Sequence, residues 1–180
     1  MRTALALVVL LMVGACGDKG KAPPPPPAAM GSDAVGHYCG MTLADHPGPK
    51  GQIQVKSRKE PYWFSSARDT LAFTMLPEEP KDIAAIYVTA MDKAASWEQP
   101  GQAAWVDAHA ASYVVGSDAK GGMGQNEVVP FTTPEAAEAF ARQHGGQVYG
   151  FDRVPHDKVL GEDTPAVQSH EDGHQGGSHP

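Results

Sequence analysis

A histidine, a cysteine and a methionine alternate with other residues in the segment His37-Tyr38-Cys39-Gly40-Met41. In an extended segment the residues i and i+2 point to the same side, so this spacing predicts that all three side chains converge on one point. Imidazole, thiolate and thioether form a soft ligand set, which suits Cu(I) and binds Mg²⁺ or Ca²⁺ poorly. The segment is therefore a candidate copper site, although a single Met most often fills a core.

A second candidate thioether is Met123, which lies in Gly121-Gly122-Met123-Gly124. Glycines on both sides predict an irregular, mobile loop, and they leave Met123 little neighbouring bulk to pack against. We expect this loop to bring Met123 onto a metal that Cys39 holds.

The other cysteine, Cys16, comes shortly after an apolar segment that runs from Ala4 to Val13. A single basic residue, Arg2, precedes this segment. This order is typical of a secretory signal. Val13-Gly14-Ala15-Cys16 resembles the lipobox of bacterial lipoproteins, which predicts a signal peptide over residues 1–15 and a lipid on Cys16. The alternative is an ordinary signal peptide with a chance cysteine. No Asp follows Cys16 directly, which favours anchoring in the outer membrane, facing the periplasm.

Lipidation of Cys16 would leave Cys39 as a single free thiol in an oxidising compartment, without a partner for a disulfide. Such a thiol is a liability unless it is buried or used. Cys39 is therefore the residue that says most about function.

Composition excludes several function classes. The 180 residues carry 14 Lys and Arg and a formal net charge of −7, which argues against nucleic-acid binding. No hydrolase nucleophile elbow, zinc-protease helix or phosphate-binding loop motif is present, so we expect no enzymatic activity.

Composition also divides the chain. Residues 16–36 contain five consecutive prolines and predict an extended, lipidated linker that cannot join a packed core. Residues 37–155 would form the folded domain. Residues 156–180 are polar and rich in histidine, which predicts a disordered tail. That tail either binds divalent metals weakly or carries incidental histidines.

Two similar stretches suggest how the domain is built. Phe64-Ser65-Ser66, with Phe73 on the following helix, is matched by Phe131-Thr132-Thr133 with Phe140. We expect two tandem strand-strand-helix units packed as one α+β domain, unless such junctions recur by chance. The predicted strands cover residues 52–56, 62–64, 83–89, 112–115, 128–131 and 147–151, and the predicted helices residues 66–75 and 135–144.

Over residues 37–155, and in its lipobox, the chain resembles the NosL family, accessory lipoproteins of bacterial nitrous-oxide respiration. The segments that carry the resemblance are His37 to Met41, His46 to Gln52, Met123-Gly124, Phe131 to Thr133 and Ala136 to Gly146. The resemblance implies a two-unit α+β fold and a Cu(I) chaperone. It also implies delivery of copper to nitrous-oxide reductase through a membrane complex that contains an ABC transporter.

The resemblance assigns the copper site residue by residue. Cys39, Met41 and Met123 match the family's copper candidates, and His37 matches a histidine often found before the cysteine. The histidine-rich tail is not part of the family pattern. A different hypothesis also fits the chain, namely a lipoprotein interaction module or thiol-based redox sensor without metal transfer. A copper carrier would need the thiol and the thioethers, whereas a sensor would need the thiol alone.

The lipobox generates a first prediction. Cys16→Ser should release the protein from membranes and leave the folded domain and its metal binding intact, because anchoring and folding lie in separate segments. Membrane fractionation is the measurement. A Cys16→Ser protein that still sediments with membranes would refute the lipid anchor.

Overall fold

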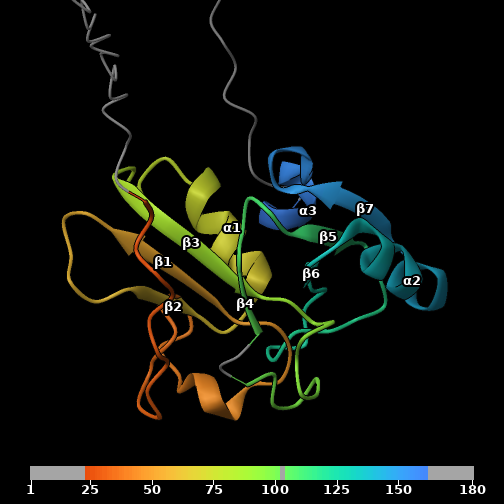
Figure 1. Cartoon of the computed structure of the whole chain (residues 1–180), viewed down its shortest axis with the longest axis horizontal. Helices are drawn as coiled ribbons and strands as arrows, with labels where there is room; N and C mark the ends of the chain where they lie inside the picture. The colour runs from red at the N-terminus through yellow and green to blue at the C-terminus, as the bar shows by residue number, and fades with distance from the viewer. Residues whose placement is uncertain (1–22, 102–103, 162–180) are drawn as a thin grey trace, which may run out of the picture.

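The computed structural model describes residues 23–101 and 104–161. Its first half is a four-stranded antiparallel sheet with one helix (Figure 1). The strand order is β2-β1-β3-β4. Its elements are β1 (Gly51–Val55), β2 (Tyr62–Phe64), α1 (Ala67–Met75), β3 (Ile83–Thr89) and β4 (Trp105–Asp107), preceded by the 3-10 helix η1 (Leu43–Asp45).

The second half repeats the pattern of two strands, a helix and a strand. Its sheet is also antiparallel, in the order β6-β5-β7. In both halves the first strand lies between the second and the third, an arrangement that the prediction of two strand-strand-helix units did not include. The elements are β5 (Ser112–Val115), β6 (Val129–Phe131), α2 (Pro134–His144) and β7 (Gln147–Gly150), followed by the 3-10 helix η3 (Phe151–Arg153) and α3 (His156–Leu160). The predicted α+β class is confirmed.

Both main helices begin where the sequence predicts. The Ser66 hydroxyl accepts a hydrogen bond from the Asp69 amide at 3.3 Å, and the Thr133 hydroxyl accepts one from the Ala136 amide at 3.2 Å. Each hydroxyl satisfies an amide that has no partner inside the helix. Helix α2 ends at Gly145, whose φ of +72° is a conformation that glycine adopts without strain.

One core joins the two sheets. Alternate side chains of β1 and β3 face α1, and Phe64 meets Phe73 edge to face at 5.5 Å. Tyr113 from β5 enters the same core with no exposed surface, and its hydroxyl donates to the Ala108 carbonyl at 2.7 Å. Val114 points to a smaller core with Phe131 on the other side of β5. The central strand of the second sheet is thus buried on both faces.

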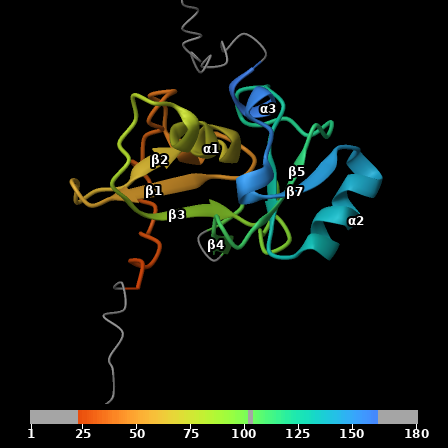
Figure 2. The same ribbon diagram turned by 90° about the horizontal axis from the view of Figure 1, so that it is seen from above.

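The proline-rich segment departs from the expectation of a free spacer. Residues 23–30, here called the proline strap, lie against the sheet face opposite α1 (Figures 1 and 2). Proline has no N–H and a polyproline backbone leaves its carbonyls free, so such a segment is recognised by donors. Three side chains of the sheet donate to it: Gln52 to the Ala28 carbonyl (3.1 Å), Gln54 to Pro26 (2.7 Å) and Tyr87 to Pro25 (2.7 Å).

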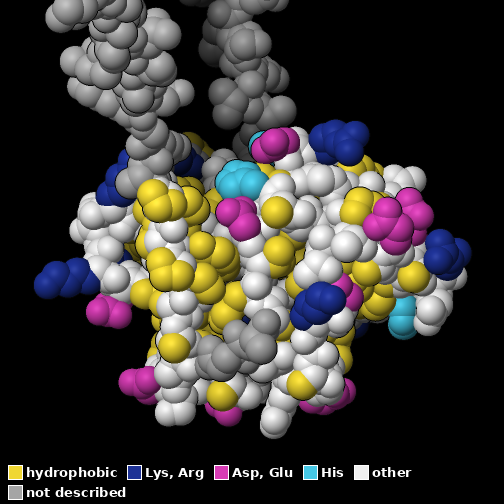
Figure 3. Space-filling model, in the orientation of Figure 1, with side chains coloured by type: hydrophobic (Ala, Val, Ile, Leu, Met, Phe, Trp, Pro, Cys, Tyr) yellow, Lys and Arg dark blue, Asp and Glu magenta, His cyan; other side chains and the backbone are white. Residues whose placement is uncertain are grey.

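The Gln52 side chain explains why the strap is held in register. Its Oε1 also accepts from the Ala28 amide at 2.8 Å, and Gln52 is completely buried. Figure 3 views this face, where hydrophobic side chains gather over the strap and the sheet, and Lys and Arg stand singly. The packed part of the chain therefore begins before residue 37.

The start of the predicted disordered tail is also folded. Residues 156–160 form helix α3, where Val159 is buried and its carbonyl accepts from Arg68 Nε of α1 at 2.7 Å. The histidines at 170, 174 and 179 lie outside the described residues. Strand β4 was not predicted at all. Among the described residues no helix is both long and apolar enough to cross a membrane.

The strap generates a stability prediction. A chain that begins at Gly31 should have a free energy of unfolding about 4 kcal/mol lower than one that begins at Pro23, because it loses four hydrogen bonds, two with Gln52 and one each with Gln54 and Tyr87. Tyr87→Phe, which removes a single bond, should lose about 1 kcal/mol. Urea denaturation measures both. Equal stability of the two chain lengths would show that the strap is only a spacer.

Candidate metal centre

Cys39 lies in a closed turn rather than in the extended segment that the sequence predicted. The Gly40 amide donates to the Gly36 carbonyl and the Gly36 amide to the Met41 carbonyl, both at 2.9 Å. We call residues 36–41 the Cys39 turn. A Cβ atom at Gly36 would lie 2.5 Å from Cys39 Sγ, so any other residue there would displace the thiol. The argument that alternate residues converge is therefore wrong for this segment.

The thiol itself is half-buried and free. Its Sγ lies 3.5 Å from the Ser65 hydroxyl, in the link between β2 and α1, and 4.0 Å from the Met41 carbonyl. The Met41 side chain leaves the same turn and is 40% exposed.

Met123 stands at the tip of a hydrogen-bonded turn, where the sequence predicted an irregular loop. The Glu127 amide donates to the Ala119 carbonyl at 3.1 Å, which closes the segment. We call residues 119–127 the Met123 loop. Inside it, the Gly124 amide donates to the Gly121 carbonyl at 2.8 Å, and Gly124 has a φ of +76°. Met123 is 52% exposed.

The Cys39 turn and the Met123 loop meet at one cavity of about 250 Å³. Cys39 and Met123 both line it, although the whole first sheet and β5 lie between them in the sequence. Helix α1 supplies another wall, with Arg68 and Asp69. The structure therefore brings two of the predicted sulfur donors to one place. Met41 belongs to the Cys39 turn but does not line this cavity.

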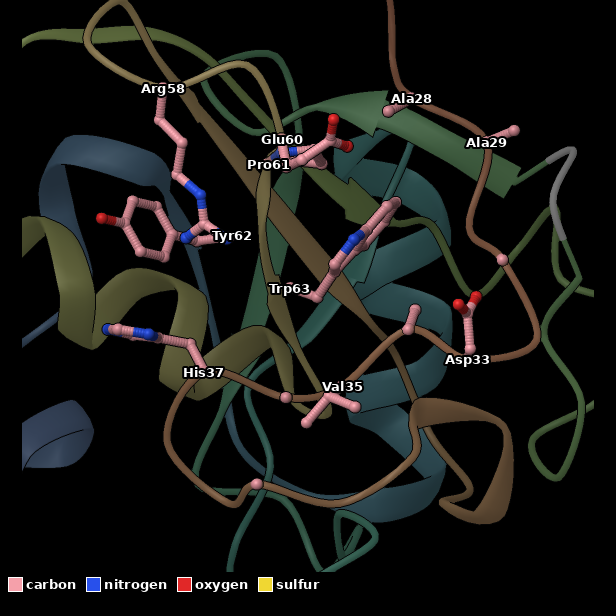
Figure 4. Close-up of a pocket in the computed structure, with 14 residues that line it drawn as sticks. Ala28, Ala29, Asp33, Val35, His37, Arg58, Glu60, Pro61, Tyr62 and Trp63 are labelled. Atoms are coloured by element: carbon pink, nitrogen blue, oxygen red, sulfur yellow. The ribbon is translucent and has the colours of Figure 1, made fainter.

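His37 lies in a different cavity, of about 590 Å³, beside Tyr62 (Figure 4). Its ring meets that of Tyr62 edge to face at 4.7 Å. Its Nε2 is 3.4 Å from Glu79 Oε1. The structure does not bring His37 and Cys39 to one cavity.

The Glu79 carboxylate also accepts a hydrogen bond from the Cys39 turn. The Tyr38 hydroxyl donates to Glu79 Oε1 at 2.9 Å. Burial, together with this hydrogen bond to a carboxylate, raises the pKa of Tyr38 well above its usual value. Tyr38 therefore keeps its proton and stays a donor, so the turn remains tied to the segment that follows α1.

The cavity lined by Cys39 and Met123 also contains a carboxylate, Glu127, that the sequence did not predict. Glu127 is 2% exposed, and its Oε1 accepts from the Ser66 hydroxyl (3.0 Å), the Arg68 amide (3.0 Å) and the Val128 amide (2.9 Å). Burial raises the pKa of Glu127 to about 7, against the lowering effect of these hydrogen bonds. No local pattern in the sequence marks this glutamate as buried.

The donors at the cavity are therefore sulfur atoms beside a buried carboxylate. Within residues 23–101 and 104–161, no three His, Cys, Asp or Glu side chains gather closely enough to hold a metal ion. The donor that shares the cavity with Cys39 is the Met123 thioether, and thioethers favour soft cations.

The chain is similar to known proteins over its folded part. Residues 27–159 match the family model described as NosL. The chain is 40% identical over 161 residues to the copper-binding lipoprotein NosL of Achromobacter cycloclastes, covering 89% of this chain and 83% of that protein. It is 33% identical over 168 residues to the copper-binding lipoprotein NosL of Stutzerimonas stutzeri, covering 92% and 85%.

A solved structure is similar as well. The crystal structure of the copper chaperone NosL from Shewanella denitrificans matches with a TM-score of 0.70 at 34% sequence identity. The match covers 74% of this chain and 98% of that chain.

Glu127 generates a prediction on pH. Its pKa is about 7 in the folded chain and its ordinary value is 4.5, so the folded state binds more protons between these pH values. The parent protein therefore loses stability as the pH rises through this window, because the carboxyl ionises in the unfolded chain while the buried carboxyl of the folded chain stays protonated. Glu127→Gln cannot ionise. Its free energy of unfolding, relative to the parent, should rise by on the order of 3 kcal/mol between about pH 4.5 and about pH 8.

Chemical denaturation of both proteins at several pH values is the measurement. Groups other than Glu127 contribute equally to parent and variant, so the difference between them isolates this carboxyl. A difference that does not change with pH would contradict the raised pKa.

Proposed function

This chain belongs to the NosL family, and from that membership we propose that it is a membrane-anchored, extracytoplasmic chaperone that carries Cu(I). The observation that carries the proposal is the shared cavity of Cys39 and Met123. A thiol and a thioether from distant segments meet there, on the part of the chain that matches the relatives named as copper-binding.

The chemistry of the donors favours Cu(I). Thiolate and thioether sulfur are soft ligands, which select Cu(I) over hard cations such as Mg²⁺ and Ca²⁺. We propose as ligands Cys39 and Met123, which line one cavity, together with Met41, whose exposed side chain leaves the Cys39 turn and which the family resemblance includes. His37 is left out, because its Nε2 lies beside Glu79 in another cavity. Cys39 must lose its proton to bind, so Cu(I) affinity should rise with pH.

The exposure of the two methionines suits a carrier. Met41 and Met123 are 40% and 52% exposed, so a receiving protein can reach the metal from their side. A site with few ligands also leaves room for a ligand from the recipient before the donor ligands let go. The proposal thus involves transfer of a metal ion and contains no catalytic step.

The proposed anchor and recipient rest on the lipobox and the family. Cys16 would carry the lipid, which holds the domain at the periplasmic side of the outer membrane, and residues 16–22 lie outside the described residues. The recipient that we propose is apo nitrous-oxide reductase, supplied through a membrane complex that contains an ABC transporter. The two relatives, both copper-binding lipoproteins, support the anchor and the cargo.

The ligand set is tested by three variants. Cys39→Ala should abolish tight Cu(I) binding, because the thiolate is the strongest donor. Met41→Ala and Met123→Ala should each lower Cu(I) affinity by about tenfold or more. Competition titration with a chromophoric Cu(I) chelator is the measurement, with circular dichroism as the folding control.

A matched control is Met75→Leu, at the end of α1, where the methionine packs against the core. This variant should bind Cu(I) like the parent. If Met41→Ala and Met123→Ala also bind like the parent, the thioether site is wrong. The module that needs only the Cys39 thiol would then be the better account.

A further inference from the structure

Glu127 is a buried carboxylate that the copper chemistry does not use. It stands at the end of the Met123 loop, directly before the strand residues that lead into β6. Its side chain turns inward, and all three of its hydrogen bonds converge on Oε1. Burying a carboxylate lowers the stability of the fold, because desolvation disfavours its charge. Such a residue therefore suggests a role that requires its position.

On one side, Glu127 holds the start of α1. Ser66 and Arg68 both donate to it at 3.0 Å, and the Arg68 amide is one of the first-turn amides that have no partner inside the helix. The preceding residue, Ser65, lies 3.5 Å from Cys39 Sγ. Glu127 therefore binds the residue next to Ser65, whose hydroxyl contacts the thiol.

On its other side, Glu127 supports the Met123 loop. A Cβ atom at Gly121 would lie 2.6 Å from Glu127 Oε2, so the loop backbone rests directly on the carboxylate. Oε2 is buried and has no hydrogen-bond partner among the described residues. The Glu127 amide, bonded to the Ala119 carbonyl, closes the same loop.

The next glycine gives the loop a second support. A Cβ atom at Gly122 would lie 2.6 Å from His46 Cβ, so the backbone before Met123 also packs against this buried histidine. Glycines 121 and 122 are thus needed for close approach to Glu127 and His46. This differs from the mobile, packing-free loop that the sequence suggested.

We propose that Glu127 is a positioning residue of the copper site, which holds Met123 at the cavity that Cys39 lines by joining the Met123 loop to the start of α1. The inference rests on the proposed function and adds a residue that does not itself touch the metal. A positioning residue should act on Cu(I) affinity only through the ligand that it positions. A residue that merely stabilises the fold would act independently of Met123.

A double-mutant cycle in the full chain separates these two roles. The variants are Glu127→Ala, Met123→Ala and the combination, and Cu(I) affinity is measured by competition with a chromophoric chelator. Glu127→Ala should lower Cu(I) affinity about tenfold in the parent. In the Met123→Ala background it should cause no further loss. Glu127→Gln, which keeps an oxygen acceptor for the three donors, should restore most of the affinity.

Gly121→Ala provides a second route if Glu127→Ala does not fold. Its new methyl group would meet Oε2 and move the loop, so it should lower Cu(I) affinity in the parent and not in the Met123→Ala background. The matched control is Asp118→Ala, whose exposed carboxylate pairs with His144 at 2.9 Å just before the loop. This control should bind Cu(I) like the parent.

The outcomes distinguish the two levels of the account. If the losses from Glu127→Ala and Met123→Ala multiply, or if Glu127→Ala and Gly121→Ala bind Cu(I) like the parent, the positioning role is overturned and the ligand set stands. If Met123→Ala itself binds like the parent, the proposed ligand set fails, and the positioning role fails with it.

Discussion

The hydrogen bonds between the first turn of α1 and the Glu127 carboxylate connect the two halves of the molecule beside the cavity that Cys39 and Met123 line. Ser66 takes part twice, because its hydroxyl accepts from the Asp69 amide and donates to Glu127 Oε1. One side chain therefore both starts the helix and fixes the end of the Met123 loop. Cys39 lies against the residue before Ser66, so the two sulfur residues that line the cavity, Cys39 and Met123, are placed relative to the same point of the backbone.

The repeated strand-strand-helix-strand pattern explains why such a connection exists. Each sheet covers a core with one helix, and Tyr113 carries the second sheet into the core of the first. The link between β2 and α1 and the Met123 loop between β5 and β6 lie where the two halves meet. The Cys39 turn is fixed against the edge strand β2, since the His37 amide donates to the Trp63 carbonyl at 2.7 Å. A binding site at this boundary needs residues from both halves.

Local patterns predicted the elements that local physics determines. The strand over residues 83–89 and the caps at Ser66 and Thr133 follow from β-branched residues and hydroxyls at known positions, and they are confirmed. The Cys39 turn, the strap and α3 could not be predicted in this way. Each depends on a tertiary partner: Trp63 for the turn, the donors of β1 and β3 for the strap, and Arg68 for α3.

The candidate site shows the same limit. Residue types and the family resemblance identified Cys39 and Met123, but only the fold places them at one cavity and moves His37 to another. Glu127 could not be found, because nothing beside it in the sequence indicates burial. Copper X-ray absorption of the Cu(I)-loaded protein tests most directly whether Cys39 and Met123 bind the metal together. The copper should have a sulfur-dominated coordination shell that loses a sulfur neighbour in Met123→Ala. A shell of nitrogen and oxygen, or one unchanged in Met123→Ala, would contradict this shared binding.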